Sequence, residues 1–190
     1  LFFEIILAPG YEKNALELLK SKKNRIILQA KSFDFQPKQF RTVLNGVLQQ
    51  DRDLKTESSE NFRVVTRVAP DNTQEKDLVF ANIIVKHSKS NAIVLVKGKQ
   101  MVGSGAGQTS RVDALKHAIE KARSFGLDLG GAVMSSDAFF PFADSVEIAH
   151  KAGIVSVVQP GGSVRDEDTI EYCNEHGLSM VFTGIRHFKH

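Results

Sequence analysis

The sequence predicts an α/β fold, a mixed-sheet sandwich, and three observations support this prediction. Short apolar runs alternate with amphipathic segments through the second half of the chain, as expected of strands and helices packed in layers. Glycines stand between these segments, where turns and helix ends need them. The 190 residues are 42% hydrophobic and 25% charged, which is an ordinary composition for a folded globular protein.

The first part of the chain predicts a strand, a helix and a second strand. Residues 1–8 form an apolar run that ends at a Pro-Gly pair, and residues 25–30 form another. Between them, residues 11–22 carry alanine and leucines at helical spacing. Residues 40–50 are ambiguous, because their apolar spacing fits a helix but an internal Asn-Gly pair disfavours one.

A charged loop at residues 51–60 is the best candidate for an internal boundary. Beyond it, the turn Lys97-Gly98-Lys99 predicts a β-hairpin, and a stripe of alanines predicts one closely packed helix face. We expect helices at residues 74–87, 110–125, 145–152 and 166–175, and strands at residues 92–96, 101–103, 132–134, 154–158 and 179–183.

Charge and cysteine content exclude several classes of protein. The net charge of +3 suits an anionic ligand as well as nucleic acid, but no Lys/Arg run exceeds Lys22-Lys23, so the polybasic patch of a nucleic-acid binder is missing. Cys173 is the single cysteine, which excludes an internal disulfide and the zinc site of a deaminase. No apolar run is long enough to span a bilayer, so we expect no membrane partner and a cytoplasmic protein.

Lys86 and His87 are adjacent where a predicted helix gives way to a strand. A lysine could act as a charged donor and a histidine as a general base, because histidine titrates near neutral pH. The alternative is a basic helix end, in which both side chains complement the helix dipole. Spacing alone favours the second interpretation and leaves the first open.

A glycine-rich stretch, residues 103–111, follows a predicted strand and opens a helix. Glycines let backbone N–H groups approach a ligand, and a helix N-terminus favours anions. The alternative is a turn whose Thr109 or Ser110 caps the helix. Arg111 lies in the first helical turn, against the helix dipole, which indicates that it contacts an anion or a carbonyl group.

The stretch Ser-Ser-Asp-Ala-Phe-Phe-Pro-Phe, residues 135–142, places aromatic side chains beside Asp137 on irregular backbone. Aromatic faces could hold a flat heterocycle, Asp137 could bind a cation, and Asp144 could bond the edge of a ring. The alternative is a capped helix entry with buried aromatics. In the tail, Arg186 follows an apolar strand and suits phosphate binding, unless the terminus is frayed.

Taken in order, these segments resemble one family, the bifunctional purine-biosynthesis enzyme that joins AICAR transformylase to IMP cyclohydrolase. The resemblance covers nearly the whole chain and falls on the C-terminal half of the transformylase region. It rests on Val-Lys-His-Ser-Lys-Ser-Asn-Ala-Ile-Val, Gly-Ala-Gly-Gln-Thr-Ser-Arg-Val, Ser-Ser-Asp-Ala-Phe-Phe-Pro-Phe, Gln-Pro-Gly-Gly-Ser-Val-Arg-Asp and Thr-Gly-Ile-Arg-His-Phe-Lys-His.

The resemblance implies formyl transfer from 10-formyltetrahydrofolate to the 5-amino group of AICAR, and a cytidine-deaminase-like fold without zinc. It implies a potassium or other monovalent cation at Asp137. Lys86 and His87 resemble the duplicated counterpart of a catalytic pair that lies upstream of Leu1. The implied substrate contacts are Asn91, Arg111, Phe139, Arg186 and Phe188, and the implied folate contacts are Val112, Pro141, Phe142 and Asp144.

The same resemblance implies partners and a division of the chain. Residues 1–60 would end the first transformylase subdomain and connect it to the C-terminal subdomain, residues 61–190. Because the chain starts at Leu1 inside an apolar run, we expect a fragment that needs an upstream transformylase half, a cyclohydrolase domain and a second copy in a homodimer. The family usually has Arg at the position of Ala143 and often Asn or Gly at that of Ser145. The alternative function is a non-catalytic nucleotide-binding or dimerisation module.

Overall fold

The computed structural model describes residues 3–189, and the chain divides into two compact units between Leu54 and Lys55. This division lies inside the charged loop at residues 51–60 and before the predicted division after residue 60. Residues 55–60 belong to the second unit, where the side chain of Glu57 is buried. A charged loop therefore contains a segment that folds with the larger unit.

The first unit contains a parallel pair of strands, β1 (Ile5–Ala8) and β2 (Ile26–Gln29), joined by the helix α1 (Lys13–Lys20). The hydroxyl of Tyr11 donates to the carbonyl oxygen of Leu28 at 2.8 Å and holds the crossover against the second strand. The predicted order of strand, helix and strand is confirmed for the described residues; residues 1 and 2 of the predicted first strand lie outside them.

Residues 40–50 do not form a helix. They belong to an antiparallel hairpin of β3 (Lys38–Val43) and β4 (Gly46–Asp51), in which Val43 pairs with Gly46. Leu44, in the turn, has a φ of 49°, a left-handed conformation that no helix contains. The helical alternative is wrong because its apolar spacing arises from two strands, and the Asn-Gly pair indicated the turn.

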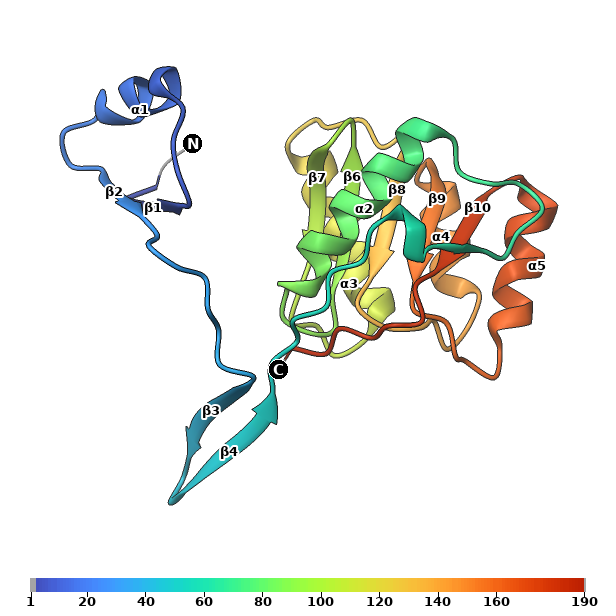
Figure 1. Cartoon of the computed structure of the whole chain (residues 1–190). Helices are drawn as coiled ribbons and strands as arrows, with labels where there is room; N and C mark the ends of the chain where they lie inside the picture. The colour runs from blue at the N-terminus through green and yellow to red at the C-terminus, as the bar shows by residue number, and fades with distance from the viewer. Residues whose placement is uncertain (1–2, 190) are drawn as a thin grey trace. The chain divides into compact units, whose positions relative to one another are not determined.

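The second unit is built on a six-stranded mixed sheet of order β5-β10-β9-β8-β6-β7 (Figure 1). Strands β8, β9 and β10 run parallel, whereas β6 is antiparallel to both of its neighbours and β5 is antiparallel to β10. The strands are β5 (Arg63–Val64), β6 (Ile93–Lys97), β7 (Gln100–Gly105), β8 (Ala132–Ser136), β9 (Ile154–Gln159) and β10 (Ser179–Phe182).

Helices cover both faces of this sheet, which confirms the predicted sandwich. Along β6, Val94 and Val96 pack with α2, while Ile93 and Leu95 pack with α3 and its neighbours, as alternation along a strand requires. Figure 1 shows α2 in front of the sheet and α3 behind it. The elements are the short η1 (Ser59–Asn61) and the helices α2 (Asn72–Lys86), α3 (Arg111–Ser124), α4 (Asp144–Lys151) and α5 (Asp166–His176).

The helix α3 lies unusually close to β7. A Cβ atom added to Gly105 would fall 2.0 Å from the carbonyl oxygen of Ala114, and one added to Gly103 would fall 2.3 Å from that of Ala118. The predicted alanine stripe is thus the helix face that meets two strand glycines. This contact fixes the start of α3, where Arg111 lies.

Candidate functional site

The predicted substrate contacts and Asp137 lie on segments that come together at one edge of the six-stranded sheet because of its strand register. Ile93, at the start of β6, pairs with Ser136 at the end of β8 and with Gly105 at the end of β7. The segments that follow or precede these positions therefore leave the sheet side by side. The backbone N–H of Asp137 donates to the carbonyl oxygen of Ala92 at 3.3 Å, which extends the pairing beyond the strands.

Arg111 and Asp137 form the charged centre of this edge. Ser110 caps α3 by accepting from the N–H of Asp113 at 3.1 Å, and Arg111 is the first residue of the helix. Its Nη2 donates to Asp137 Oδ1 at 3.1 Å; the carboxylate is fully buried and the arginine side chain is 13% exposed. Burial lowers the pKa of Arg111 below its ordinary value, Asp137 opposes this effect, and the charge of Arg186 adds to it.

Two arginines share one aromatic ring at this edge. The guanidinium carbon of Arg186 lies 3.8 Å from the ring centroid of Phe188, and that of Arg111 lies 5.9 Å from the same centroid. Arg186 also lies 5.6 Å from the ring of Phe139. The structure thus brings together four of the five predicted substrate contacts, and we call Arg111, Phe139, Arg186 and Phe188 the arginine–phenylalanine cluster.

The tail that carries part of this cluster is bound along residues 186–189, not frayed. Its backbone is held on two sides: the N–H of His187 donates to the carbonyl oxygen of Asp137 at 3.0 Å, and the N–H of Ser90 donates to that of Lys189 at 2.7 Å. The N–H of Lys189 returns a bond to Ser90 Oγ at 3.0 Å. The alternative of a frayed terminus is therefore wrong for these residues.

Asn91, the fifth predicted substrate contact, supports the loop in front of α3. Its side-chain Nδ2 donates to the carbonyl oxygens of Gln108 at 3.0 Å and Thr109 at 3.2 Å. The glycine-rich stretch is thereby tied to the start of β6, and Arg111 follows directly. These bonds give Asn91 a structural role, and its contact with a substrate stays a prediction.

The predicted folate contacts lie partly on an exposed loop. Phe142 is 50% exposed, and the guanidinium carbon of Arg165 lies 5.0 Å from its ring. Asp144 is exposed at the start of α4 and accepts from the N–H of Ser145 at 2.7 Å. Pro141 is exposed as well, and Val112 follows Arg111 on α3. Arg165 was not predicted, although it belongs to one of the quoted motifs.

The phenylalanines of residues 135–142 have different environments. Phe140 is fully buried, and its N–H donates to Gln159 Oε1 at 3.1 Å, so this ring belongs to the core. Phe139 is half-buried and Phe142 is exposed. The buried-aromatic alternative therefore holds for Phe140, while the two flanking rings are accessible to a flat ligand.

Lys86 and His87 contact other parts of the unit. Lys86 is buried; its Nζ donates to Thr56 Oγ1 at 3.0 Å and to the carbonyl oxygen of Lys55. His87 caps the C-terminus of α2, and its carbonyl oxygen accepts from Lys189 Nζ at 3.3 Å. The bonds of Lys86 agree with a structural role at a helix end, and catalysis by either residue stays a prediction.

The immediate surroundings of Asp137 fit a cation poorly. Of its two carboxylate oxygens, Oδ1 is bonded to a guanidinium, which repels a second positive charge, and the buried Oδ2 has no hydrogen-bond partner among residues 3–189. No group of three or more His, Cys, Asp or Glu side chains in the described part of the chain is placed to hold a metal ion. A monovalent cation at Asp137 stays a prediction, and no chemical step below depends on it.

The site also contains a buried pair that sequence reasoning missed. Glu57 and His187 lie 2.8 Å apart through Oε2 and Nε2, and each side chain is 2% exposed. His187 belongs to a quoted motif, but nothing around Glu57 in the charged loop indicates a buried carboxylate. Only the folded structure shows that the loop reaches the tail.

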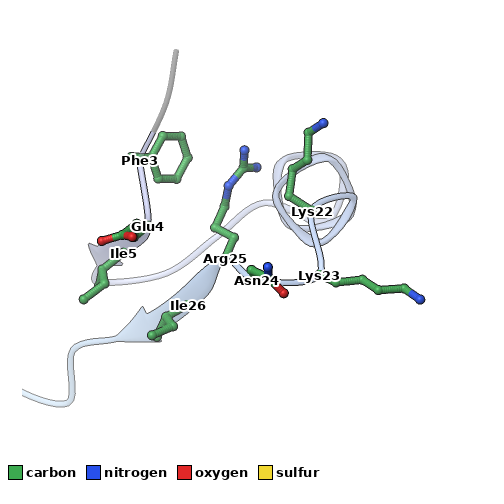
Figure 2. A pocket seen from close by; sticks show the side chains of 8 residues that line it. All are labelled: Phe3, Glu4, Ile5, Lys22, Lys23, Asn24, Arg25 and Ile26. Carbon is green, nitrogen blue, oxygen red and sulfur yellow. The ribbon is translucent and has the colours of Figure 1, made fainter.

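A separate pocket in the first unit is lined by Phe3, Glu4, Ile5, Lys22, Lys23, Asn24, Arg25 and Ile26. Figure 2 shows the Arg25 guanidinium beside the ring of Phe3, whereas Lys23 extends away from both. The guanidinium carbon lies 4.3 Å from the ring centroid, and Nη1 donates to the carbonyl oxygen of Leu19 at 3.0 Å. None of the predicted site residues lies here.

Across residues 3–189, every helix is too short or too polar to cross a membrane.

Comparisons with known proteins identify the relatives of this chain. The family model of the AICARFT/IMPCHase bienzyme matches residues 1–121. The bifunctional purine biosynthesis protein PurH of Bacteroides thetaiotaomicron is 65% identical over 190 residues, which are 100% of this chain and 38% of that protein. PurH of Aquifex aeolicus is 50% identical and matches 100% of this chain and 37% of that protein. The chain thus spans less than half the length of the curated relatives that it matches.

Among solved structures, the dCMP deaminase of cyanophage S-TIM5 in complex with dCMP and dUMP is similar at a TM-score of 0.40 and 15% identity. The match covers 60% of this chain and 98% of that one. The TM-score is low, so the fold described here rests on its own strand order: a mixed sheet between two helical layers.

Proposed function

The chain belongs to the AICARFT/IMPCHase bienzyme family, and on that premise we propose that it carries part of a site that transfers a formyl group to AICAR. In this step of IMP biosynthesis the 5-amino nitrogen of the ribonucleotide bonds the formyl carbon of 10-formyltetrahydrofolate and loses a proton. The bond from that carbon to the folate nitrogen breaks, and tetrahydrofolate leaves with a proton on that nitrogen. The activity is that of a phosphoribosylaminoimidazolecarboxamide formyltransferase in the cytoplasm. The proposal concerns the whole enzyme, because the chain matches 38% of the length of the Bacteroides thetaiotaomicron relative.

The arginine–phenylalanine cluster is the observation that carries this proposal. Two guanidinium groups lie near one ring, and the carboxylate of Asp137 is bonded to only one of them. The charge of Arg186 already lowers the pKa of Arg111, so the two cations repel each other. An anion bound between them would relieve that repulsion, and a phosphate accepts the paired bonds that guanidinium groups donate.

Aromatic rings beside this anion site favour a nucleotide over free phosphate. Phe139 is half-buried next to Arg186, so one part of its surface remains accessible to a flat imidazole with its carboxamide. Asn91 holds the loop in front of Arg111 and would keep that arginine in register. We assign AICAR to this cluster.

The exposed ring of Phe142 supports a place for the folate. Arg165 lies over this ring at 5.0 Å, and Pro141 and Asp144 flank it in the chain. A pterin would stack on such a surface, while an arginine nearby would attract the carboxylates of the folate tail. We assign 10-formyltetrahydrofolate to Val112, Pro141, Phe142 and Asp144.

Formyl transfer needs a proton acceptor for the amine that attacks the formyl carbon. Lys86 and His87 are the candidates within this chain, and the catalytic pair implied by the family resemblance is upstream of it. We therefore propose a composite site, completed by the upstream transformylase half and a second copy in a homodimer, beside the cyclohydrolase domain. A deaminase-like fold without zinc belongs to the same proposal.

One observation favours the alternative of a nucleotide-binding or dimerisation module without activity of its own. The paired strands of the first unit expose large apolar side chains: Ile5 is 57% exposed, Leu7 59% and Ile26 51%. Exposed apolar surface of this kind marks an interface. The chain would then bind AICAR or a partner segment without transferring a formyl group.

The test is formyl transfer by the full-length protein that carries these residues. Arg186→Ala should raise the KM for AICAR about tenfold or more, and Phe142→Ala should do the same for the folate, because each removes a binding contact. Two control variants remove the same residue types at other places. Arg63→Ala removes an arginine that lies 5.3 Å from the ring of Phe182, and Phe125→Ala removes an exposed ring that lies 5.0 Å from Lys121 Nζ. Unchanged kinetics in both site variants would sink the proposal.

The alternative is distinguished by binding to this chain alone. Calorimetry with AICAR at low and moderate salt, with and without a folate analogue, measures whether the cluster is preorganised. Saturable binding without turnover, even after the rest of the protein is added back, favours the non-catalytic module. Turnover that returns on addition favours the composite enzyme.

A further inference from the structure

A chain of buried polar side chains links the segment after Leu54 to the tail. Glu57 Oε2 is 2.8 Å from His187 Nε2 and accepts from Asn82 Nδ2 at the same distance. Ser135 Oγ donates to Asn82 Oδ1 at 3.3 Å, which fixes the orientation of that amide. The four residues come from the segment before η1, from α2, from β8 and from the tail. None of them has a task in the formyl transfer proposed above.

The tail geometry gives this chain a consequence for the site. Arg186 and Phe188 contact each other, whereas the side chain of His187 between them is buried. His187 is 2% exposed, whereas Arg186 is exposed and stacks on Phe188 at 3.8 Å. The position of the buried imidazole therefore sets the direction of both neighbouring side chains.

Glu57 Oε2 contacts the Nε2 atom of that imidazole at 2.8 Å. A buried carboxylate is unfavourable unless polar partners satisfy it, and Oε2 of Glu57 has two: the Asn82 amide, which donates, and Nε2 of His187. Its other oxygen, Oε1, is buried without a hydrogen-bond partner among residues 3–189. An apolar contact would stabilise the unit equally well but would not fix the orientation of the imidazole, whereas a pair of polar groups does.

The segment that carries Glu57 is itself fixed. Lys86 Nζ bonds both Lys55 and Thr56, the two residues in front of the glutamate. The start of the second unit and the end of the described chain thus share one bonded network, although Glu57 and His187 are 130 positions apart. A shift of this segment would move the tail with it.

We propose that Glu57 is a positioning residue that orients Arg186 and Phe188 for AICAR through His187. The inference rests on the proposed function for the identity of the ligand, and on the contacts above for the positioning. Glu57 touches no reacting group in this scheme. Its effect is confined to how the tail presents its arginine and its ring.

The first test is kinetic and uses the full-length protein. Glu57→Ala should raise the KM for AICAR about tenfold while kcat and the KM for the folate stay within about twofold. Glu57→Gln keeps a polar side chain of the same length that can bond His187 and accept from Asn82, so it should restore the KM to within about threefold. Glu60→Ala, an exposed glutamate in the same segment, is the matched control. If Glu57→Ala does not fold, Glu57→Asp, which shortens the side chain and breaks the 2.8 Å contact, replaces it.

The second test does not depend on turnover. Hydrogen exchange of the backbone amides of His187 and Lys189 reports the bonds of the tail to Asp137 and Ser90. Exchange at both should be faster in Glu57→Ala, whereas exchange of Val157 in β9 should not change. Unchanged exchange of the tail amides would overturn the positioning role. So would a lower kcat with both KM values unchanged, because a loss of folded enzyme gives that result. If the parent transfers no formyl group, the proposed function fails and the exchange data still decide the positioning.

Discussion

Arg111 and Asp137 form an ion pair in which the guanidinium Nη2 lies 3.1 Å from Oδ1 of a carboxylate with no exposed surface. The pair joins the first turn of α3 to the loop after β8, and the N–H of His187 bonds the carbonyl oxygen of the same aspartate. Three chain segments of the candidate site therefore depend on one residue. Removing either charge leaves the other buried without its partner.

We expect Asp137→Ala to lower the free energy of unfolding by about 3 kcal/mol, the usual loss when one partner of a buried ion pair is removed. The double variant Arg111→Ala with Asp137→Ala should lose less than the sum of the single variants, because neither charge is then stranded. Urea denaturation measures both. Asp128→Ala, which breaks the exposed pair with Lys97, should leave the unfolding midpoint nearly unchanged. Additive losses would contradict the buried pair.

Gly105 should tolerate no side chain. A Cβ atom there would lie 2.0 Å from the carbonyl oxygen of Ala114, so α3 must move away from β7 to admit it. We expect Gly105→Ala to destabilise the protein by about 3 kcal/mol, as overpacking a core does. Gly130→Ala is the control, because its nearest neighbour is the flexible end of Asp128 at 3.3 Å. Equal melting temperatures for the two variants would contradict the close approach.

The larger unit could be predicted from the sequence because its signals are local. β8, β9 and β10 are short apolar runs between glycines, and α2 and α3 have apolar residues at helical spacing. β5 was not predicted: it has two residues, one of them Arg63, and it exists only because β10 pairs with it. Residues 40–50 were ambiguous, because their apolar spacing fits a helix whereas the internal Asn-Gly pair disfavours one.

Only part of the site could be predicted, because the signals in the sequence are local. Motifs indicated Arg111, Phe139, Arg186 and Phe188 one by one, but no spacing shows that an arginine meets an aspartate 26 positions later. The Glu57–His187 bond joins two residues that are 130 positions apart, and a charged loop gives no sign of a buried carboxylate. Such pairs depend on the tertiary fold, which local patterns do not encode.

Cys173 should be nearly inert in the folded protein. Burial raises the pKa of its thiol to about 12 from an ordinary value of 9.0, so almost no reactive thiolate is present at pH 8. Alkylation of the Cys173 peptide, followed by mass spectrometry, should be slow in buffer and rapid in urea. The stabilising contribution of the neutral thiol is complete below pH 9.0 and is lost as pH rises through about 12, because the unfolded chain releases its proton first. Rapid native alkylation would contradict this burial.

The repulsion between Arg111 and Arg186 predicts a salt dependence of AICAR binding. In the proposed site both guanidinium groups would attract the phosphate of AICAR, and attraction between partly exposed charges weakens as salt screens it. We expect the KM for AICAR to rise between about 0.05 and 0.2 M salt, and to rise less steeply in Arg186→Ala because one of the two cations is gone. Arg63→Ala removes an arginine that stacks over Phe182 and should keep the full slope. Equal slopes in the parent and in Arg186→Ala would mean that the phosphate binds elsewhere on the protein, and that the arginine–phenylalanine cluster does not form its site.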